Sequence, residues 1–109
     1  MLTVGRVPNT ARLDIAGWET DQQAWIVADR YCKTSGENIY ALGDVLGSNK
    51  IMLAHVESME GRVAAENCLG KSEKMDWETI PSAVFTGLEI ATVGLTETQA
   101  VEIAFAPCI

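Results

Sequence analysis

The sequence has few of the residues on which several classes of protein depend. Its 109 residues include one histidine, His55, and three cysteines, at positions 32, 68 and 108. A single histidine excludes a multi-histidine metal site, and cysteines spaced this widely match neither a metal-ligand spacing nor a redox pair. We therefore expect reduced thiols in a cytoplasmic protein.

Basic residues and long apolar runs are also scarce. Lys and Arg number 8 against 15 Asp and Glu, so the formal net charge is -7. Such an acidic chain would repel phosphate backbones and anionic lipid, so neither nucleic acid nor a membrane is an expected partner. No run approaches the roughly 20 apolar residues of a membrane-spanning helix. The N-terminus, Met1 to Gly5, shows no secretory signal.

Enough apolar material remains to build a core. Hydrophobic residues make up 48% of the chain and charged residues 21%, a balance that argues against wholesale disorder. A chain of this length accommodates one modest domain or pieces of larger ones. No internal repeat or low-complexity stretch is visible.

The longest periodic pattern predicts a helix over residues 53–69. Gly70 follows at the position where a left-handed C-terminal cap belongs. The polar segment 71–78 reads as a connector. Apolar residues recur in the helix at helical spacing: Leu53, Val56, Met59, Val63, Ala64 and Cys68.

Shorter patterns predict the other elements. Thr96 and Gln99 form a capping box, which predicts a second helix through about residue 102. The run 39–42, closed by Gly43, resembles a buried central strand, and 44–50 reads as a loop. We expect an α/β fold, or α+β for an isolated fragment. Apolar runs predict four strands: 24–28, 39–42, 83–86 and 91–93.

One group of residues suggests a ligand-binding site. Gly43 and Asp44 follow a predicted strand, and a helix opens soon after at residues 52–55. A carboxylate at a strand end can accept hydrogen bonds from a polyol, and a helix start offers free N–H groups to an electron-rich carbonyl. Flavin has both a polyol chain and electron-rich carbonyl groups. The site would fit flavin if Asp44 and the Ala54 amide face one cavity. On this pattern alone, an ordinary turn in which Asp44 bonds its own backbone is the commoner explanation.

Four separated motifs resemble, in order and spacing, the class I pyridine nucleotide-disulfide oxidoreductases. Within that family, MLAH at 52–55 and AAEN at 64–67 are most similar to bacterial dihydrolipoamide dehydrogenases. Mercuric reductases and soluble transhydrogenases are alternative relatives. The motifs are GRVPNT at 5–10, TSGENIYALGDV at 34–45, the helical segment 52–67, and residues 80–97.

The resemblance implies roles for particular residues. Asp44, preceded by Gly43, matches the aspartate that holds the ribityl chain of FAD. The backbone of Met52, Leu53, Ala54 and His55 matches the segment facing the flavin pyrimidine edge. Gly5 matches a glycine where the chain leaves the nicotinamide-nucleotide domain, although an ordinary loop glycine is equally open. FAD is thus the implied cofactor, with NAD in the parent enzyme, and no catalytic or metal-binding residue is assigned.

The resemblance also implies a domain division. Residues 1–75 would be a returning segment of the FAD domain, beginning at the end of the NAD domain. Residues 76–109 would be the start of the interface, or dimerisation, domain. The sequence departs from the family at Gly87-Leu88, where His-Pro is usual, and in the apolar tail 107–109.

Several family motifs do not occur in these residues. The sequence has no G-x-G-x-x-G turn, no C-x4-C pair and no second histidine for a His–Glu base. We therefore expect an internal fragment that is inactive alone, and a homo-oligomer formed through open strand edges, with or without exchanged strands. The alternatives are a non-catalytic, self-associating interaction module and an unrelated small α/β domain.

Overall fold

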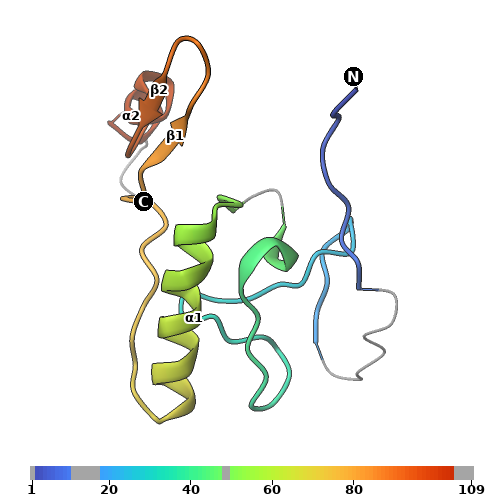
Figure 1. Cartoon of the computed structure of the whole chain (residues 1–109). Helices are drawn as coiled ribbons and strands as arrows, with labels where there is room; N and C mark the ends of the chain where they lie inside the picture. Colours follow the sequence, from blue (N-terminus) through green and yellow to red (C-terminus); the bar gives the residue numbers. More distant parts are fainter. Residues whose placement is uncertain (1, 11–17, 48–49, 105–109) are drawn as a thin grey trace. The chain divides into compact units, whose positions relative to one another are not determined.

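The computed structural model describes residues 2–10, 18–47 and 50–104. The chain forms two compact units, Met1–Met75 and Asp76–Ile109, and each is described by itself. Helices and strands both occur, so the predicted α/β class is confirmed (Figure 1). The elements are the 3-10 helix η1 (Gly43–Leu46), α1 (Ala54–Cys68), β1 (Ser82–Val84), β2 (Ile90–Thr92) and α2 (Glu97–Ala104).

The helix predicted over 53–69 is confirmed as α1, and Gly70 ends it as expected. Gly70 has a φ of 84°, which a residue without Cβ adopts without strain. Its N–H donates to the carbonyl of Asn67 at 3.0 Å, and the N–H of Lys71 donates to the carbonyl of Glu66 at 3.1 Å. These two hydrogen bonds form a Schellman cap, which satisfies carbonyls at the end of the helix.

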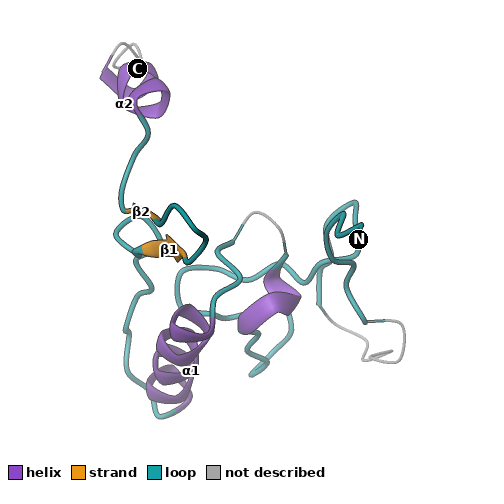
Figure 2. Cartoon of the chain, turned by 45° about the horizontal axis from the view of Figure 1, so that its top comes forward, coloured by secondary structure: helices purple, strands orange, loops and turns teal. Residues whose placement is uncertain are grey.

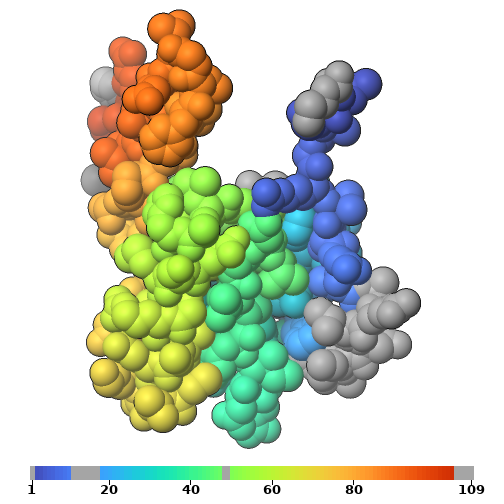
Figure 3. All heavy atoms as spheres, in the orientation of Figure 1, coloured from blue at the N-terminus to red at the C-terminus, as the bar shows by residue number. Residues whose placement is uncertain are grey.

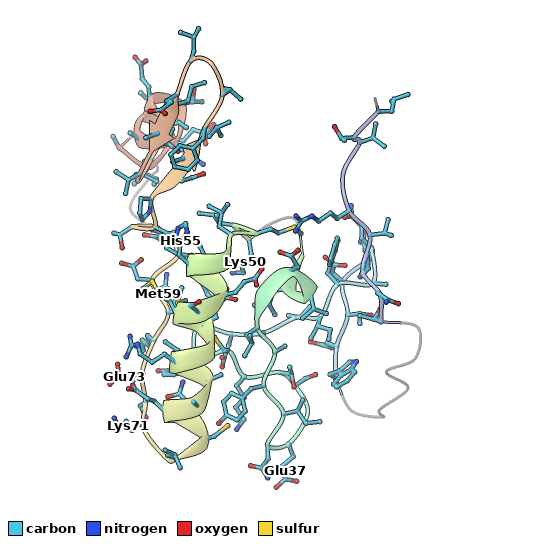
Figure 4. The ribbon with its side chains drawn as sticks, in the orientation of Figure 1. Glu37, Lys50, His55, Met59, Lys71 and Glu73 are labelled. Atoms are coloured by element: carbon cyan, nitrogen blue, oxygen red, sulfur yellow. The ribbon has the colours of Figure 1, made fainter. Side chains whose placement is uncertain are left out.

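The buried face of α1 differs in part from the predicted one. Met59 is 43% exposed and Cys68 is exposed, so their predicted place on the apolar face was wrong. Figure 4 shows Met59 on the side of α1 away from η1. Glu60 and Asn67 lie on the buried face instead, because each side chain forms hydrogen bonds with backbone groups of the loops packed against it. The buried residues of α1 are Val56, Glu60, Val63, Ala64 and Asn67.

Before η1, the chain folds into short antiparallel turns, drawn almost entirely as loop in Figure 2. Ala24, Cys32 and Asn38 have left-handed φ values of 67°, 59° and 58°, so each extended stretch turns back after a few residues. Isolated bridges join Thr20 to Ile26, Ala28 to Thr34, and Lys33 to Tyr40.

The strands predicted at 24–28 and 39–42 were therefore wrong. The left-handed Ala24 lies inside the first, where only Ile26 and Ala28 form isolated bridges. In the second, Ala41 alone is buried and Leu42 is exposed. The positive φ of Gly43 then turns the chain into η1, within the predicted loop 44–50. A buried strand needs ladder partners along its length, which the described residues do not provide here.

The segment after α1 folds back along the helix. The N–H of Met75 donates to the carbonyl of Arg30 at 2.7 Å, and the side chain of Met75 is buried. Figure 3 shows the side chains of α1 packed directly against those of the preceding turns and η1. The core of the first unit thus lies between one face of α1 and the 20–47 segment.

In the second unit, both predicted strands and the predicted helix are present, shifted by one or two residues. β1 and β2 pair antiparallel, with Ala83 opposite Ala91. The hairpin forms with Gly87 and Leu88 in its connection, the pair at which the sequence departs from the family pattern. The capping box opens α2: the N–H of Thr96 donates to Oε1 of Gln99 at 2.9 Å, and the N–H of Gln99 donates to Oγ1 of Thr96 at 3.3 Å.

Candidate functional site

The position of Asp44 is set by its neighbour. The N–H of Gly43 donates to Oε2 of Glu60 at 2.7 Å, and Glu60 is only 1% exposed. Gly43 has a φ of 78°, a conformation that favours glycine. A carboxylate buried in α1 thus fixes the backbone just before Asp44 against the first half of that helix.

The carboxylate of Asp44 has two different surroundings. Its Oδ2 accepts a hydrogen bond from Nη1 of Arg6, an ion pair between partly exposed groups. Its Oδ1 is buried and has no hydrogen-bond partner among the described residues. A buried acceptor without a partner is energetically costly, so this oxygen is suited to a donor from outside the described chain, such as a hydroxyl group.

Two open pockets share Gly5 and Arg6, and the larger of them is also lined by Asp44. The smaller, of about 440 Å³, is lined by Gly5, Arg6, Lys50 and Met52. The larger, of about 560 Å³, has an apolar wall beside the Asp44 carboxylate. Its lining residues are Gly5, Arg6, Val7, Pro8, Asn9, Trp25, Asp44 and Val45.

The start of α1 leaves backbone donors available. The carbonyl of Leu53 accepts from the amides of Val56 and Glu57 at 2.9 and 3.1 Å. The amides of Met52 and Ala54 have no acceptor among the described residues. The positive end of the helix dipole adds to the attraction of these N–H groups for an electron-rich oxygen.

The structure brings only some of the expected residues together. Gly5, Asp44 and Met52 line the two pockets, and Gly43 directly precedes Asp44. Leu53, Ala54 and His55 follow at the helix start but do not line either pocket (Figure 4). The shared cavity expected for Asp44 and the Ala54 amide therefore stays a prediction.

Gly5 is explained by its backbone conformation. Its φ is 114°, and a Cβ added there would meet no atom within 4 Å. An L-residue would be strained by this dihedral angle, although there is space for its side chain. The backbone conformation thus favours glycine at this position.

Sequence reasoning missed three residues around Asp44. Arg6 lies within the 5–10 motif, yet no role followed from that position. Glu57 and Glu60, three residues apart, face Gly43 and Asp44 from one side of α1. A hydrogen bond to Asp44 is the main cause that raises the pKa of Glu57, followed by desolvation and the charges of Asp44 and Glu60, against an opposing effect of Arg6. The helical spacing of the two glutamates was the only available signal.

Comparison with known proteins identifies the family. Residues 1–61 match the sequence profile of the pyridine nucleotide-disulphide oxidoreductases. The chain belongs to this family. Dihydrolipoyl dehydrogenase 3 of Haloarcula marismortui is 46% identical over 98% of the chain, and the dihydrolipoyl dehydrogenase of Bacillus subtilis is 41% identical over 94%. The chain spans only 22% of the length of each of these relatives.

Solved structures show the same relationship. LpdA from Mycobacterium tuberculosis superimposes with a TM-score of 0.79, at 35% identity over 97% of this chain and 23% of that one. The flavoprotein disulfide reductase RclA from Escherichia coli gives 0.74, at 30% identity over 90% of this chain and 23% of its own. The predicted resemblance to disulfide oxidoreductases of the dihydrolipoamide dehydrogenase type is therefore confirmed.

Two further properties concern only the described part of the chain. No helix there is sufficiently long and apolar to span a bilayer. No group of three or more His, Cys, Asp or Glu side chains is arranged to bind a metal ion. Cys32 and Cys68 are free thiols, and Cys108 lies outside the described residues.

Proposed function

We propose that this chain supplies the ribityl side of an FAD site, and part of the subunit interface, in a dihydrolipoamide dehydrogenase-like oxidoreductase. The parent reaction would be the NAD-linked oxidation of a dithiol. The observation that carries the proposal is the Asp44 carboxylate, whose buried Oδ1 has no partner among the described residues and whose side chain lines a partly apolar pocket.

The residues present fit a flavin. Asp44 would accept hydrogen bonds from ribityl hydroxyls, while Trp25 and Val45 supply an apolar wall. The amides of residues 52–55 would face the pyrimidine edge of the ring. When bound, a flavin supplies hydride and electron transfer, and the protein positions it and stabilises charge on its ring.

We further propose that these 109 residues do not catalyse the parent reaction by themselves. They contain no C-x4-C pair to exchange electrons with a dithiol, and no second histidine to act as its base. A dithiol is oxidised when its thiolate attacks a disulfide, which a cysteine pair of the enzyme would have to provide. Added dihydrolipoamide and NAD should therefore give no NADH with the chain alone.

The test compares two flavin compounds. Riboflavin carries a ribityl chain, whereas lumichrome has the ring system without it. Asp44→Asn should weaken riboflavin binding about 10-fold or more, because hydrogen bonds to a charged acceptor contribute about 1.5–3 kcal/mol. It should leave lumichrome binding unchanged. Flavin fluorescence on titration with the protein reports both affinities.

Glu37→Gln is the matched control, since Glu37 is an exposed carboxylate that Figure 4 places at the other end of the first unit from His55. This control substitution should change the affinity for neither riboflavin nor lumichrome. Equal loss of riboflavin and lumichrome binding in Asp44→Asn, or no loss at all, would refute the ribityl contact.

A second candidate function is that of a non-catalytic, self-associating module. Its support is the second unit, in which Phe85 and Leu88 are 82% and 85% exposed. Exposed apolar side chains grouped in this way are typical of interaction surfaces. A homo-oligomer, formed through this hairpin with or without strand exchange, follows from this proposal.

Light scattering at tens of micromolar tests the module. Paired Phe85→Ser and Leu88→Ser substitutions should convert an oligomer into a monomer. Leu69→Ser should leave the oligomer intact, because Leu69 is equally exposed, at 83%, but lies in the first unit. A monodisperse monomer of the unchanged chain would rule the module out.

A further inference from the structure

Arg6 contacts two of the residues assigned to the flavin site. Its Nη1 donates to Oδ2 of Asp44, 38 positions away, and lies 4.0 Å from Sδ of Met52, 46 positions away. Arg6 thus links the carboxylate after Gly43 to the segment that opens α1.

Arg6 also lines both pockets described above. In the larger pocket it lies with Asp44, and in the smaller with Met52 and Lys50. A ligand that occupies either pocket would therefore meet the same guanidinium group. Movement of Arg6 would change the walls of both pockets together.

The charges around Asp44 explain why a cation is needed here. Glu57 and Glu60 face it from α1, and Arg6 faces it from the N-terminal segment. Lys50, in the loop before α1, interacts electrostatically with Glu60. Arg6 is consequently a cation in direct contact with Asp44, beside two further carboxylates.

We propose that Arg6 is a positioning residue for the flavin, which holds the Asp44 carboxylate oriented so that Oδ1 accepts hydroxyl groups of the ligand. The inference rests on the proposed function, because it assigns a partner to the same site. Arg6 occupies Oδ2 and leaves Oδ1 to the ligand.

We expect the ion pair between Arg6 and Asp44 to affect ligand binding more than the stability of the fold. Both side chains are about half exposed, and exposed pairs contribute little to stability. Without Arg6, the pKa of Glu57 would rise further, and the protonated Glu57 would hydrogen-bond to Asp44 more often. That hydrogen bond would compete with the ligand for the Asp44 carboxylate.

A titration of the ligand-free chain tests this directly. Carboxyl NMR shifts should show that Arg6→Gln raises the pKa of Glu57, because a lowering influence is removed. Arg62→Gln is the matched control: Arg62 is equally exposed and pairs with Glu66 on α1 at 3.4 Å. It should leave the Glu57 titration unchanged. An unchanged Glu57 titration in Arg6→Gln would overturn the inference.

Riboflavin binding between pH 5 and 8 provides the second measurement. Arg6→Gln should bind about 10-fold more weakly at pH 7, a size typical of losing one charge-assisted contact, and should weaken further as the pH falls. Arg6→Lys keeps the charge and should restore a flat pH profile. Unchanged or tighter binding by Arg6→Gln would overturn the role of Arg6.

The two measurements separate the possible failures. If Asp44→Asn leaves riboflavin binding unchanged, the proposed flavin site fails, and the titration of Glu57 still reports whether Arg6 controls the carboxyl pair. If Asp44→Asn weakens riboflavin binding but Arg6→Gln changes neither measurement, only the inference about Arg6 fails.

Discussion

The carboxylate of Glu60 and the amide of Gly43 are joined by a hydrogen bond of 2.7 Å across 17 positions of sequence. Glu60 is fully buried in α1, and Gly43 opens η1 immediately before Asp44. The geometry of the candidate site therefore depends on a polar group in the core of the first unit.

Replacing Glu60 with alanine should destabilise the chain by about 2 kcal/mol, because the half-buried Gly43 amide loses its acceptor. Glu60→Gln keeps an acceptor oxygen and should recover part of this loss. Urea unfolding followed by circular dichroism gives the free energies, and faster hydrogen exchange at the Gly43 amide should accompany the loss. Glu73→Ala serves as the control, since its side chain is exposed. Equal stability of Glu60→Ala and the parent chain would contradict the prediction.

Asn67 should be as important for the segment that follows α1. Its Nδ2 donates to the carbonyls of Tyr31 and Glu73 at 3.0 and 2.9 Å, and its Oδ1 accepts from the Glu73 amide at 2.8 Å. Asn67→Ala should cost about 2–3 kcal/mol of unfolding free energy, because three bonds are lost at a buried position. Cys68→Ala, at the exposed neighbouring position, should be close to neutral. Protection of the Met75 amide from hydrogen exchange should fall in Asn67→Ala alone.

Two glycines should respond in opposite ways to alanine. Gly47 has a φ of 93°, and a Cβ there would lie 2.6 Å from Cγ of Trp25. Gly47→Ala should therefore cost about 3 kcal/mol through strain and overpacking. Gly61 lies inside α1, where a Cβ would meet nothing within 4 Å, so Gly61→Ala should stabilise by about 1 kcal/mol. Thermal unfolding of both variants checks the sign, and a loss of stability in Gly61→Ala would show that its space is occupied.

The two described cysteines should differ in reactivity. Burial, followed by the charges of Glu60 and Asp29, raises the pKa of Cys32 to about 11 from 9.0, whereas Cys68 is exposed. Since the thiolate is the nucleophile, iodoacetamide should modify Cys68 rapidly and Cys32 only after unfolding. A Cys108→Ser background simplifies mass spectrometry. Equal rates for the two thiols in the folded chain would contradict this expectation.

The same pKa difference predicts a pH dependence of stability. Between pH 9 and about 11 the folded chain keeps the Cys32 proton, while the unfolded chain loses it. The folded state then binds more protons, so the free energy of unfolding falls as the pH rises through this range. Cys32→Ser, whose hydroxyl does not titrate there, should show a shallower fall than the parent chain when urea unfolding is measured from pH 8 to 11.

Local signals in the sequence determined the helices, their caps and the family. The periodicity of 53–69, the glycine at position 70 and the pair Thr96 and Gln99 each specify hydrogen bonds within a few residues, so their outcome depends little on the rest of the chain. The four motifs likewise identified the family before any fold was known.

Tertiary structure alone decided the strands before α1 and the surroundings of Asp44. The runs 24–28 and 39–42 have strand-like composition, but pairing partners and the left-handed Ala24 and Cys32 decided their conformation. The contacts of Arg6 and Glu60 with residues 43–44 join positions distant in sequence, which no local pattern specifies. Hydrophobic periodicity predicted that Met59 would be buried. Glu60 and Asn67 are buried instead, because nearby backbone groups need their side chains as hydrogen-bond partners.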